Sequence, residues 1–167
     1  MVVLPALVFI VASLTAFSTG TSWGTMAILF PVVIPLAVAM GAGVGFAGGE
    51  DYAILLGTIS SVMAGAVFGD HSSPISDTTV LSSMASACDL VDHVRTQLPY
   101  ALVVALVALA VGEIPAAAGW IHPLFALGVG ALLLVGILKI WGRNPVDGIE
   151  EALPAPGEEP EAVATGG

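Results

Sequence analysis

The sequence predicts an all-α integral membrane protein, a helical bundle that contains a hairpin of helices and a broken transmembrane helix. Of its 167 residues, 57% are hydrophobic and only 10% are charged, and the mean hydropathy is +1.01. These values lie far outside the range of a soluble globular domain. Two short stretches rich in hydroxyls and glycine interrupt the long apolar runs. Those two stretches predict the hairpin and the break.

The first element spans residues 2–40 and is predicted to be a hairpin. Two uncharged apolar runs, 2–17 and 26–40, flank the hydroxyl-rich stretch 18–25. A single helix over 2–40 would be roughly 58 Å long, almost twice the roughly 30 Å hydrocarbon core of a bilayer. The segment must therefore turn. A re-entrant hairpin, with its Ser/Thr tip at midplane depth, is favoured over two full spans joined by a polar loop outside.

A glycine-rich linker, residues 41–49, separates the hairpin from the next apolar run, residues 52–68. The linker is expected to be a flexible loop, because five glycines in nine residues disfavour a helix.

The stretch 69–79 (GDHSSPISDTT) is the densest polar segment between apolar runs. It holds two carboxylates, an imidazole and five hydroxyls. Pro74 removes a backbone donor and Gly69 permits unusual dihedral angles. Residues 69–76 are therefore predicted to be non-helical, between two helical segments. Unwound backbone at membrane depth is tolerated only where it lines a site, so this break is a candidate functional site.

Three further segments follow the break. Residues 76–94 are helical in pattern but rich in hydroxyls, and their polar end is expected at a membrane interface. Two apolar runs, 98–111 and 117–141, close the bundle, with Gly112–Pro115 predicted as the turn between them. That turn is expected to face the outside.

The few basic residues predict the orientation. Arg95 precedes the first closing run, and Lys139 and Arg143 end the second, so an even number of crossings places all three on one side. The positive-inside rule makes that side cytoplasmic. We therefore expect a multi-pass protein of the cell (plasma) membrane.

Two regions are expected along the chain. Residues 1–144 form a membrane domain, and residues 145–167 form a disordered, acidic, cytoplasmic tail. Six of the thirteen acidic residues lie in the last 21 positions, in a segment rich in proline, glycine and alanine. With three Lys and Arg in total, no basic patch remains for nucleic acid, which is not an expected partner.

Two catalytic or metal-site readings fit poorly. Gly20–Gly24 matches the nucleophile-elbow pattern G-x-S-x-G, but that motif requires a preceding strand, and here a membrane helix is predicted. Aspartate and histidine can bind transition metals, and the candidates here are Asp70, His71 and His93. Two residues adjacent on one backbone seldom form part of a zinc site, however. Transition-metal binding and hydrolysis are therefore not expected. No cofactor is expected beyond transported ions.

The residue types at the two breaks fit a small hard cation. Carboxylate, hydroxyl and freed carbonyl oxygens are the ligands that Na⁺ requires, and a broken helix supplies the carbonyls. A carboxylate in low dielectric takes either a proton or a cation, so competition between them amounts to exchange. The predicted coupling residues are Asp70, His71 and Asp77, with Na⁺ at Asp70 and Asp77. The predicted ion-binding hydroxyls are Thr19, Thr21, Ser22, Ser73, Ser76, Thr78 and Thr79.

Three stretches of the sequence resemble a known family. Gly69–Ser83 (GDHSSPISDTTVLSS), Thr19–Thr25 (TGTSWGT) and Asp92–Tyr100 (DHVRTQLPY) are similar to the signatures of the NhaC family of Na⁺/H⁺ antiporters, within the ion-transporter superfamily. The similarity spans roughly Leu4–Ala101 and keeps the family's order. Ser72 stands where many members are expected to have cysteine, which is a mild change.

The resemblance implies a secondary active transporter, not an enzyme, that exchanges Na⁺ for H⁺. Family members resemble a duplicated fold with inverted repeats, each contributing a hairpin and a broken helix to a shared midplane site. This chain holds one such set. It is expected to be one half of an inverted-repeat transporter fold, similar to a C-terminal half, and to need a missing N-terminal half or a second chain. A homodimer is also left open.

Two alternatives remain at this point. One is a Na⁺-coupled organic-acid antiporter of the malate/lactate type, although no arginine near the motif could clamp a carboxylate substrate. The other is a truncated or accessory membrane subunit that does not transport by itself. Asp70 is the preferred carrier of the exchanged proton, because His71 beside it can pass a proton. Asp77 is expected to cap the helix that restarts after the break.

Overall fold

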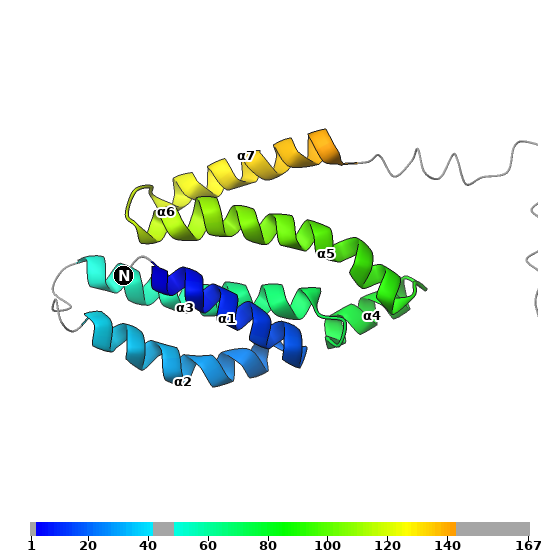
Figure 1. Ribbon diagram of the computed structural model, residues 1–167, viewed down its shortest axis with the longest axis horizontal. Coiled ribbons are helices and arrows are strands. Elements are labelled where there is room, and N and C mark those ends of the chain that lie inside the picture. Colours follow the sequence, from blue (N-terminus) through cyan, green and yellow to red (C-terminus); the bar gives the residue numbers. More distant parts are fainter. Residues whose placement is uncertain (1–2, 42–48, 143–167) are drawn as a thin grey trace, which may run out of the picture. The chain divides into compact units, whose positions relative to one another are not determined.

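The computed structural model describes residues 3–41 and 49–142, and the contacts discussed below belong to residues 3–134. The described chain is helical, as the composition predicted (Figure 1). The helices in order are α1 (Val3–Thr19), α2 (Ser22–Gly41), α3 (Gly49–Ser72), α4 (Asp77–Ala85), α5 (Leu90–Val107), the π-helix η1 (Ala108–Glu113), α6 (Ile114–Ala117) and α7 (Pro123–Trp141).

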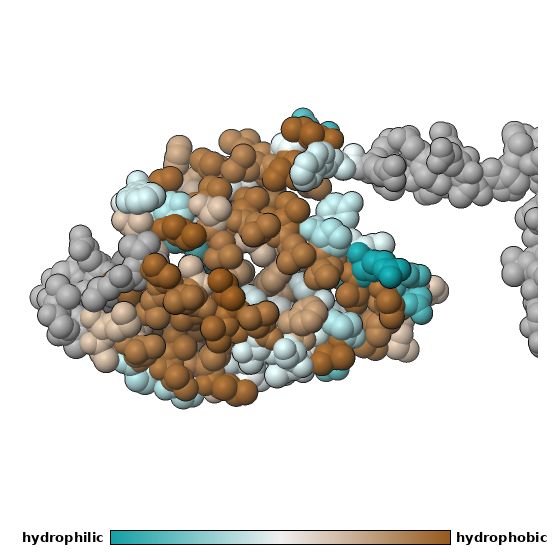
Figure 2. All heavy atoms as spheres, viewed as in Figure 1, coloured by the Kyte–Doolittle hydropathy of each residue, from teal (hydrophilic) through white to brown (hydrophobic). Residues whose placement is uncertain are grey.

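Membrane-length apolar helices account for most of the described chain. Four segments are long and apolar enough to cross a bilayer: 22–40, 54–72, 90–117 and 123–141, while α1 is apolar but shorter. Large apolar side chains stay exposed along these helices, including Leu14, Leu36 and Leu106. Figure 2 shows the same hydrophobic character over α1, α2 and α3. Exposed apolar surface of this extent fits contact with lipid, so the chain is a helical membrane bundle.

The predicted hairpin is present as α1 and α2, which both pack against α3 (Figure 1). Gly20 makes the turn between them in the left-handed region, with φ +67°. The core of this three-helix unit takes one valine from each helix: Val8, Val33 and Val62. The depth of the hairpin tip in the bilayer stays a prediction.

Helices α1 and α3 pack closely against each other at two glycines. A Cβ at Gly65 would collide with the Phe9 carbonyl, and a Cβ at Gly69 would collide with the Ser13 carbonyl. The rings of Phe9 and Phe68 stack beside these positions with centroids 6.0 Å apart. Small residues that let two backbones approach are a common way to pack helices inside a membrane.

The break after α3 is present but shorter than predicted. Residues 73–76 are non-helical, whereas residues 69–72 form the last turn of α3. The prediction that the break begins at Gly69 was wrong, because that glycine serves the close approach of α1 rather than a hinge. The helix ends where Pro74 disfavours helical geometry at the preceding Ser73. It restarts at Asp77 after Ser76, whose extended backbone has φ −72° and ψ 137°.

Residues 76–94 form two helices and not the single one predicted. Helix α4 ends at Ala85, the chain turns through Ala87 with φ +50°, and α5 begins at Leu90. Asp89 caps α5, since its side chain accepts hydrogen bonds from the backbone N–H groups of Val91 and Asp92. The polar residues that were expected at the end of a helix therefore lie at the start of α5.

The turn predicted at Gly112–Pro115 was also wrong. Glu113 ends the π-helix and Pro115 lies in the first turn of α6, so 90–117 is one apolar helical segment. Pro115 has no N–H to donate to the preceding turn, and the helix continues past it after the wider π-helical turn. The turn comes later, through Gly119 with φ +69°. Most of the predicted linker 41–49 and the whole tail 145–167 lie outside the described residues.

We predict that Gly69→Ala destabilises the protein, because the new methyl group has no space against the α1 backbone. Overpacking of this kind costs about 1–3 kcal/mol. Gly57→Ala is the matched control, since a Cβ there meets only the Pro5 Cγ at an ordinary 3.7 Å. Tryptophan-fluorescence melting in detergent micelles should show a lower Tm for Gly69→Ala alone. Equal melting of the two variants would contradict the packing argument.

Candidate functional site

The two hydroxyl-rich breaks meet in space. A Cβ at Gly20, on the hairpin tip, would lie 2.8 Å from the Ile75 carbonyl oxygen, in the break. Close by, Ser73 Oγ donates to the Phe17 carbonyl at 2.7 Å and also accepts from Ile75 N–H at 3.3 Å. The stretch 19–25 therefore lies beside the stretch 70–78 in space.

A hydrogen-bond chain joins Asp70 to Thr78 across the break, with Ser76 at its centre. Its Oδ1 accepts from Ser76 Oγ at 2.6 Å, and Ser76 Oγ lies 2.8 Å from Thr78 Oγ1. Ser76 is fully buried and Asp70 is half-buried. The break thus folds the start of α4 back onto the last turn of α3, so that hydroxyls face the carboxylate.

The two carboxylates differ in their position relative to helix dipoles. Asp70 lies in the last turn of α3, where the negative end of the dipole disfavours a bare carboxylate. Asp77 is the first residue of α4, where the positive end favours one. A cation bound at Asp70 would relieve the unfavourable arrangement. The helix dipole already stabilises an ionised Asp77, so this carboxylate does not require a bound cation.

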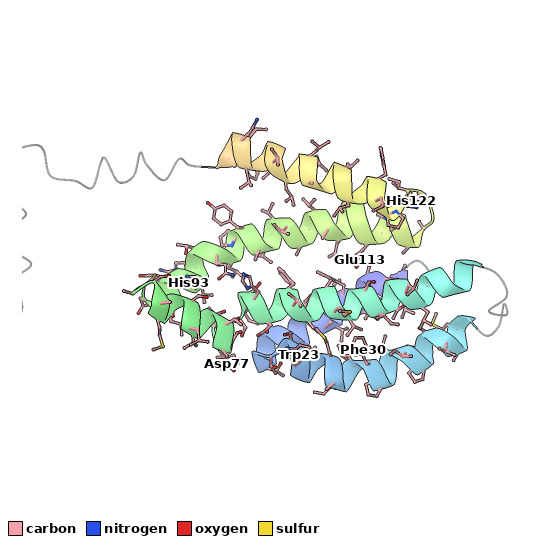
Figure 3. All side chains as sticks on the ribbon, turned by 180° about the vertical axis from the view of Figure 1, so that it is seen from behind. Trp23, Phe30, Asp77, His93, Glu113 and His122 are labelled. Carbon is pink, nitrogen blue, oxygen red and sulfur yellow. The ribbon has the colours of Figure 1, made fainter. Side chains whose placement is uncertain are left out.

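Asp77 does not join the hydrogen-bond chain. It is exposed at the start of α4 (Figure 3), and the N-cap residue is Ser76, which makes no side-chain cap bond. The expectation that Asp77 caps this helix was therefore wrong. Within the described residues, no three His, Cys, Asp or Glu side chains converge as a metal site would require. A sodium ion shared by Asp70 and Asp77 stays a prediction.

The hydroxyls of the hairpin tip form their own set of contacts. Thr25 is fully buried, lies with its Oγ1 3.3 Å from Thr19 Oγ1, and donates to the Thr21 carbonyl at 2.9 Å. Thr21 Oγ1 accepts from Gly24 N–H at 3.3 Å and so caps α2, which begins at Ser22. Thr25 was not among the predicted ligands, although it completes the same Thr-Gly-Thr-Ser-Trp-Gly-Thr stretch.

His71 is exposed and contributes mainly its backbone. Its carbonyl accepts from Thr79 Oγ1 at 3.4 Å and from Gln97 Nε2 at 3.1 Å. These contacts border a cavity of about 130 Å³, which His71 and His93 line together with hydroxyl and amide side chains. Gln97 and His93 come from α5, which follows the break and α4 in the sequence. The lining residues are His71, Thr78, Thr79, Ser82, His93 and Gln97.

Comparison with protein families identifies the chain. The model of the Na⁺/H⁺ antiporter family matches residues 1–113, which include the hairpin, the break and every candidate residue above. The chain belongs to the Na⁺/H⁺ antiporter family. The NhaC-type resemblance is thereby confirmed.

Curated relatives agree with this family. The chain is 39% identical to the Na⁺/H⁺ antiporter NhaC of Alkalihalophilus pseudofirmus over 88 residues, 50% of this chain and 18% of that protein. It is 35% identical to a malate-2H⁺/Na⁺-lactate antiporter of Bacillus subtilis over 89 residues, 53% of this chain and 17% of that protein. An uncharacterized protein of Haemophilus influenzae is 53% identical over 102 residues, 61% of this chain and 18% of that protein.

The matched segments cover less than a fifth of each of these relatives. No solved structure matches the chain.

We predict that Ser73→Ala loosens the hairpin tip from the break. The variant leaves the Phe17 carbonyl without its hydroxyl donor, which costs roughly 1 kcal/mol or more for a buried acceptor. Hydrogen–deuterium exchange should become faster in residues 17–20 and 73–76. Ser82→Ala, which changes an exposed hydroxyl on α4, is the control and should leave exchange in both segments unchanged. Unchanged exchange in Ser73→Ala would contradict the role of this bond.

Proposed function

We propose that this chain carries the ion-coupling segment of a secondary transporter that exchanges Na⁺ for H⁺, with Asp70 as the group for which the two cations compete. The observation that carries the proposal is the 2.6 Å hydrogen bond from Ser76 Oγ to Asp70 Oδ1 across the helix break. It holds a carboxylate at an unfavourable helix end beside hydroxyl oxygens. Such a carboxylate is stabilised by a bound cation or proton.

Backbone at the break adds further oxygen ligands. Pro74 has no N–H, and the Asp70 carbonyl accepts instead from Ser73 N–H at 3.1 Å. The Gly69 carbonyl therefore loses the partner that Ser73 would give it in a continuing helix. A carbonyl of this kind, together with a carboxylate and hydroxyls, matches the ligands that Na⁺ takes in discontinuous helices. We assign the hydroxyl ligands to Thr19, Thr21, Ser22, Ser73, Ser76, Thr78 and Thr79.

Exchange follows from competition at one carboxyl. Asp70 holds Na⁺ on one side of the membrane, releases it when protonated, and carries the proton back. His71 is placed beside Asp70 in sequence to pass protons, and Asp77 supplies a second negative charge at the far end of the break. No cofactor is needed besides the two transported ions. As a transporter, the protein has no enzymatic reaction to perform.

The proposal includes the location and orientation of the protein in the membrane. We place residues 1–144 in the cell membrane as a multi-pass domain, with the acidic tail 145–167 in the cytoplasm, because Arg95, Lys139 and Arg143 then share the cytoplasmic side. The relatives extend far beyond the matched segments. We therefore expect a partner segment, either an N-terminal half or a second chain, to complete the transport path.

Organic-acid exchange is the second candidate. One relative is named as a malate-2H⁺/Na⁺-lactate antiporter. The cavity lined by His71, His93 and Gln97 would offer imidazole and amide donors to a small carboxylate. If this candidate is right, Na⁺-driven proton movement will require added malate or lactate.

We predict that Asp70→Asn weakens Na⁺ binding roughly tenfold or more. Asparagine keeps the shape of the side chain but removes the negative charge that attracts the cation, and a tenfold loss of affinity corresponds to about 1.4 kcal/mol. The measurement is radioactive-sodium binding to the purified chain in lipid nanodiscs at alkaline pH. Wild-type binding should fall as the pH is lowered, because protons compete for the same carboxyl. In proteoliposomes with an internal pH dye, the variant should lose any Na⁺-driven proton movement that wild type shows.

Asp89→Asn is the matched control for this experiment. It removes the same charge from an exposed N-cap, and asparagine caps nearly as well as aspartate. It should bind Na⁺ as wild type does. Wild-type binding by Asp70→Asn would refute the assignment, and loss in Asp77→Asn alone would transfer it to Asp77. Binding without transport would identify the chain as a part that needs its partner segment.

A further inference from the structure

Glu113 is an ionisable residue within the apolar bundle. It lies in the membrane-length segment 90–117, is half-buried, and points toward α3 (Figure 3). Its Oε2 lies 2.9 Å from the Oγ of Ser61, a residue that is fully buried on α3. This contact joins two helices 52 residues apart in sequence. It is separate from the break, because Asp70 follows Ser61 by nine residues, or about 13 Å along a helix.

The hydrogen bonds around Ser61 indicate which protonation state of the Glu113 carboxyl matches the observed contacts. Ser61 Oγ lies 2.7 Å from the Gly57 carbonyl as well as 2.9 Å from Glu113 Oε2. A serine hydroxyl has one hydrogen to donate, whereas a carbonyl and a carboxylate only accept. An ionised Glu113 would therefore leave two acceptors sharing one hydrogen. A protonated Glu113 donates to Ser61 Oγ, and Ser61 donates to Gly57, so both short contacts are satisfied.

Among the described residues up to Leu134, no charged side chain is placed to act as a counter-ion of Glu113. Helix α1, which contacts η1 and α6, has no ionisable side chain. On α3, Glu50 and Asp51 precede Ser61 by about 15 Å of helix, and Asp70 and His71 follow it by a similar length.

The remaining ionisable residues considered lie before and after Glu113 in the sequence. On α5, the nearest positive charge is Arg95, 18 residues or about 27 Å of helix before Glu113, with His93 and Asp92 farther still. His122 lies beyond the following turn, and its Nδ1 accepts from Leu124 N–H. An unpaired carboxylate among apolar helices is costly, whereas a protonated carboxyl is not.

The π-helix gives this residue its position. Ile114 N–H donates to the Leu109 carbonyl, five residues back, so η1 is wider than an α-helix. In this register Pro115 would have paired with the Ala110 carbonyl, but it has no N–H. Single π-turns inside α-helices often mark functional positions. Here the π-turn ends at Glu113 and directs it to Ser61.

We propose that Glu113 is a second proton-binding carboxyl of this protein, distinct from Asp70, with Ser61 as its positioning residue. It holds a proton at neutral pH and donates it in a hydrogen bond to Ser61 Oγ. This inference goes beyond Na⁺/H⁺ exchange at the break and does not depend on it. Because the contact ties α3 to the segment 90–117, the proton at Glu113 also sets how these two helices are joined.

The test is labelling of the purified chain in lipid nanodiscs with dicyclohexylcarbodiimide, which modifies protonated carboxyls in apolar surroundings. Peptide mass spectrometry should find Glu113 modified at neutral pH, at least tenfold more than the exposed Asp89. Modification should decline at strongly alkaline pH, as the carboxyl ionises. Labelling of Glu113 no greater than that of Asp89 would overturn the proposal. This labelling experiment uses only the wild-type protein, so its result does not depend on whether variants fold.

Infrared spectroscopy tests the role of Ser61. Wild type should show a protonated-carboxyl C=O band at neutral pH that Glu113→Gln abolishes and Asp70→Asn retains. Ser61→Ala should move the band to higher wavenumber, because the carboxyl loses its hydrogen-bond partner, and Ser61→Thr should restore it. A band absent from wild type, or unchanged in Ser61→Ala, would refute the arrangement. Na⁺ binding in Glu113→Gln reports on the break separately, so failure of one proposal is distinguishable from failure of the other.

Discussion

The close approach of α1 to α3 is the contact on which the arrangement of the site depends. Because Gly65 and Gly69 carry no side chain, the α1 backbone lies directly against α3 over its last two turns. The end of α1 is thereby held beside the end of α3. The hairpin tip and the helix break, which are about 50 residues apart in sequence, meet as a result. This packing brings Ser73 of the break within hydrogen-bond distance of the Phe17 carbonyl at the end of α1.

Polar groups in this bundle are satisfied mostly within their own helix. Ser13, Thr58 and Ser72 each donate to the carbonyl four residues earlier. In the described part of the chain, no buried side-chain polar atom lacks a partner. Against this background the long-range side-chain bonds stand out, since Ser73, Ser76 and Ser61 connect separate helices or the two sides of the break. Polar contacts of that kind help to fix the geometry of a membrane bundle.

Sequence patterns predicted which helices and breaks exist better than they predicted the residues at which these elements begin and end. The hairpin follows from length alone, and the break follows from proline, which are strong local constraints. Gly69 was misjudged because a glycine can serve either a bend or a close contact, and only the position of α1 decides between them. The turn at 86–89 was missed although Asp89 is a good cap, because serine-rich helices in membranes look continuous. Glu113 was placed outside because Gly112 and Pro115 resemble a turn, whereas the π-register keeps the helix intact.

The left-handed glycine at the hairpin tip has a mechanical consequence. Gly20 is wedged against the Ile75 backbone with no space for even a methyl group, and α1 has no clearance above Gly65 and Gly69. Helix α1 therefore cannot slide along α3 by a turn without a steric collision. Over this contact, α1 and the end of α3 can move only together. A change in the shape of this bundle therefore has its hinge outside the contact between α1 and α3.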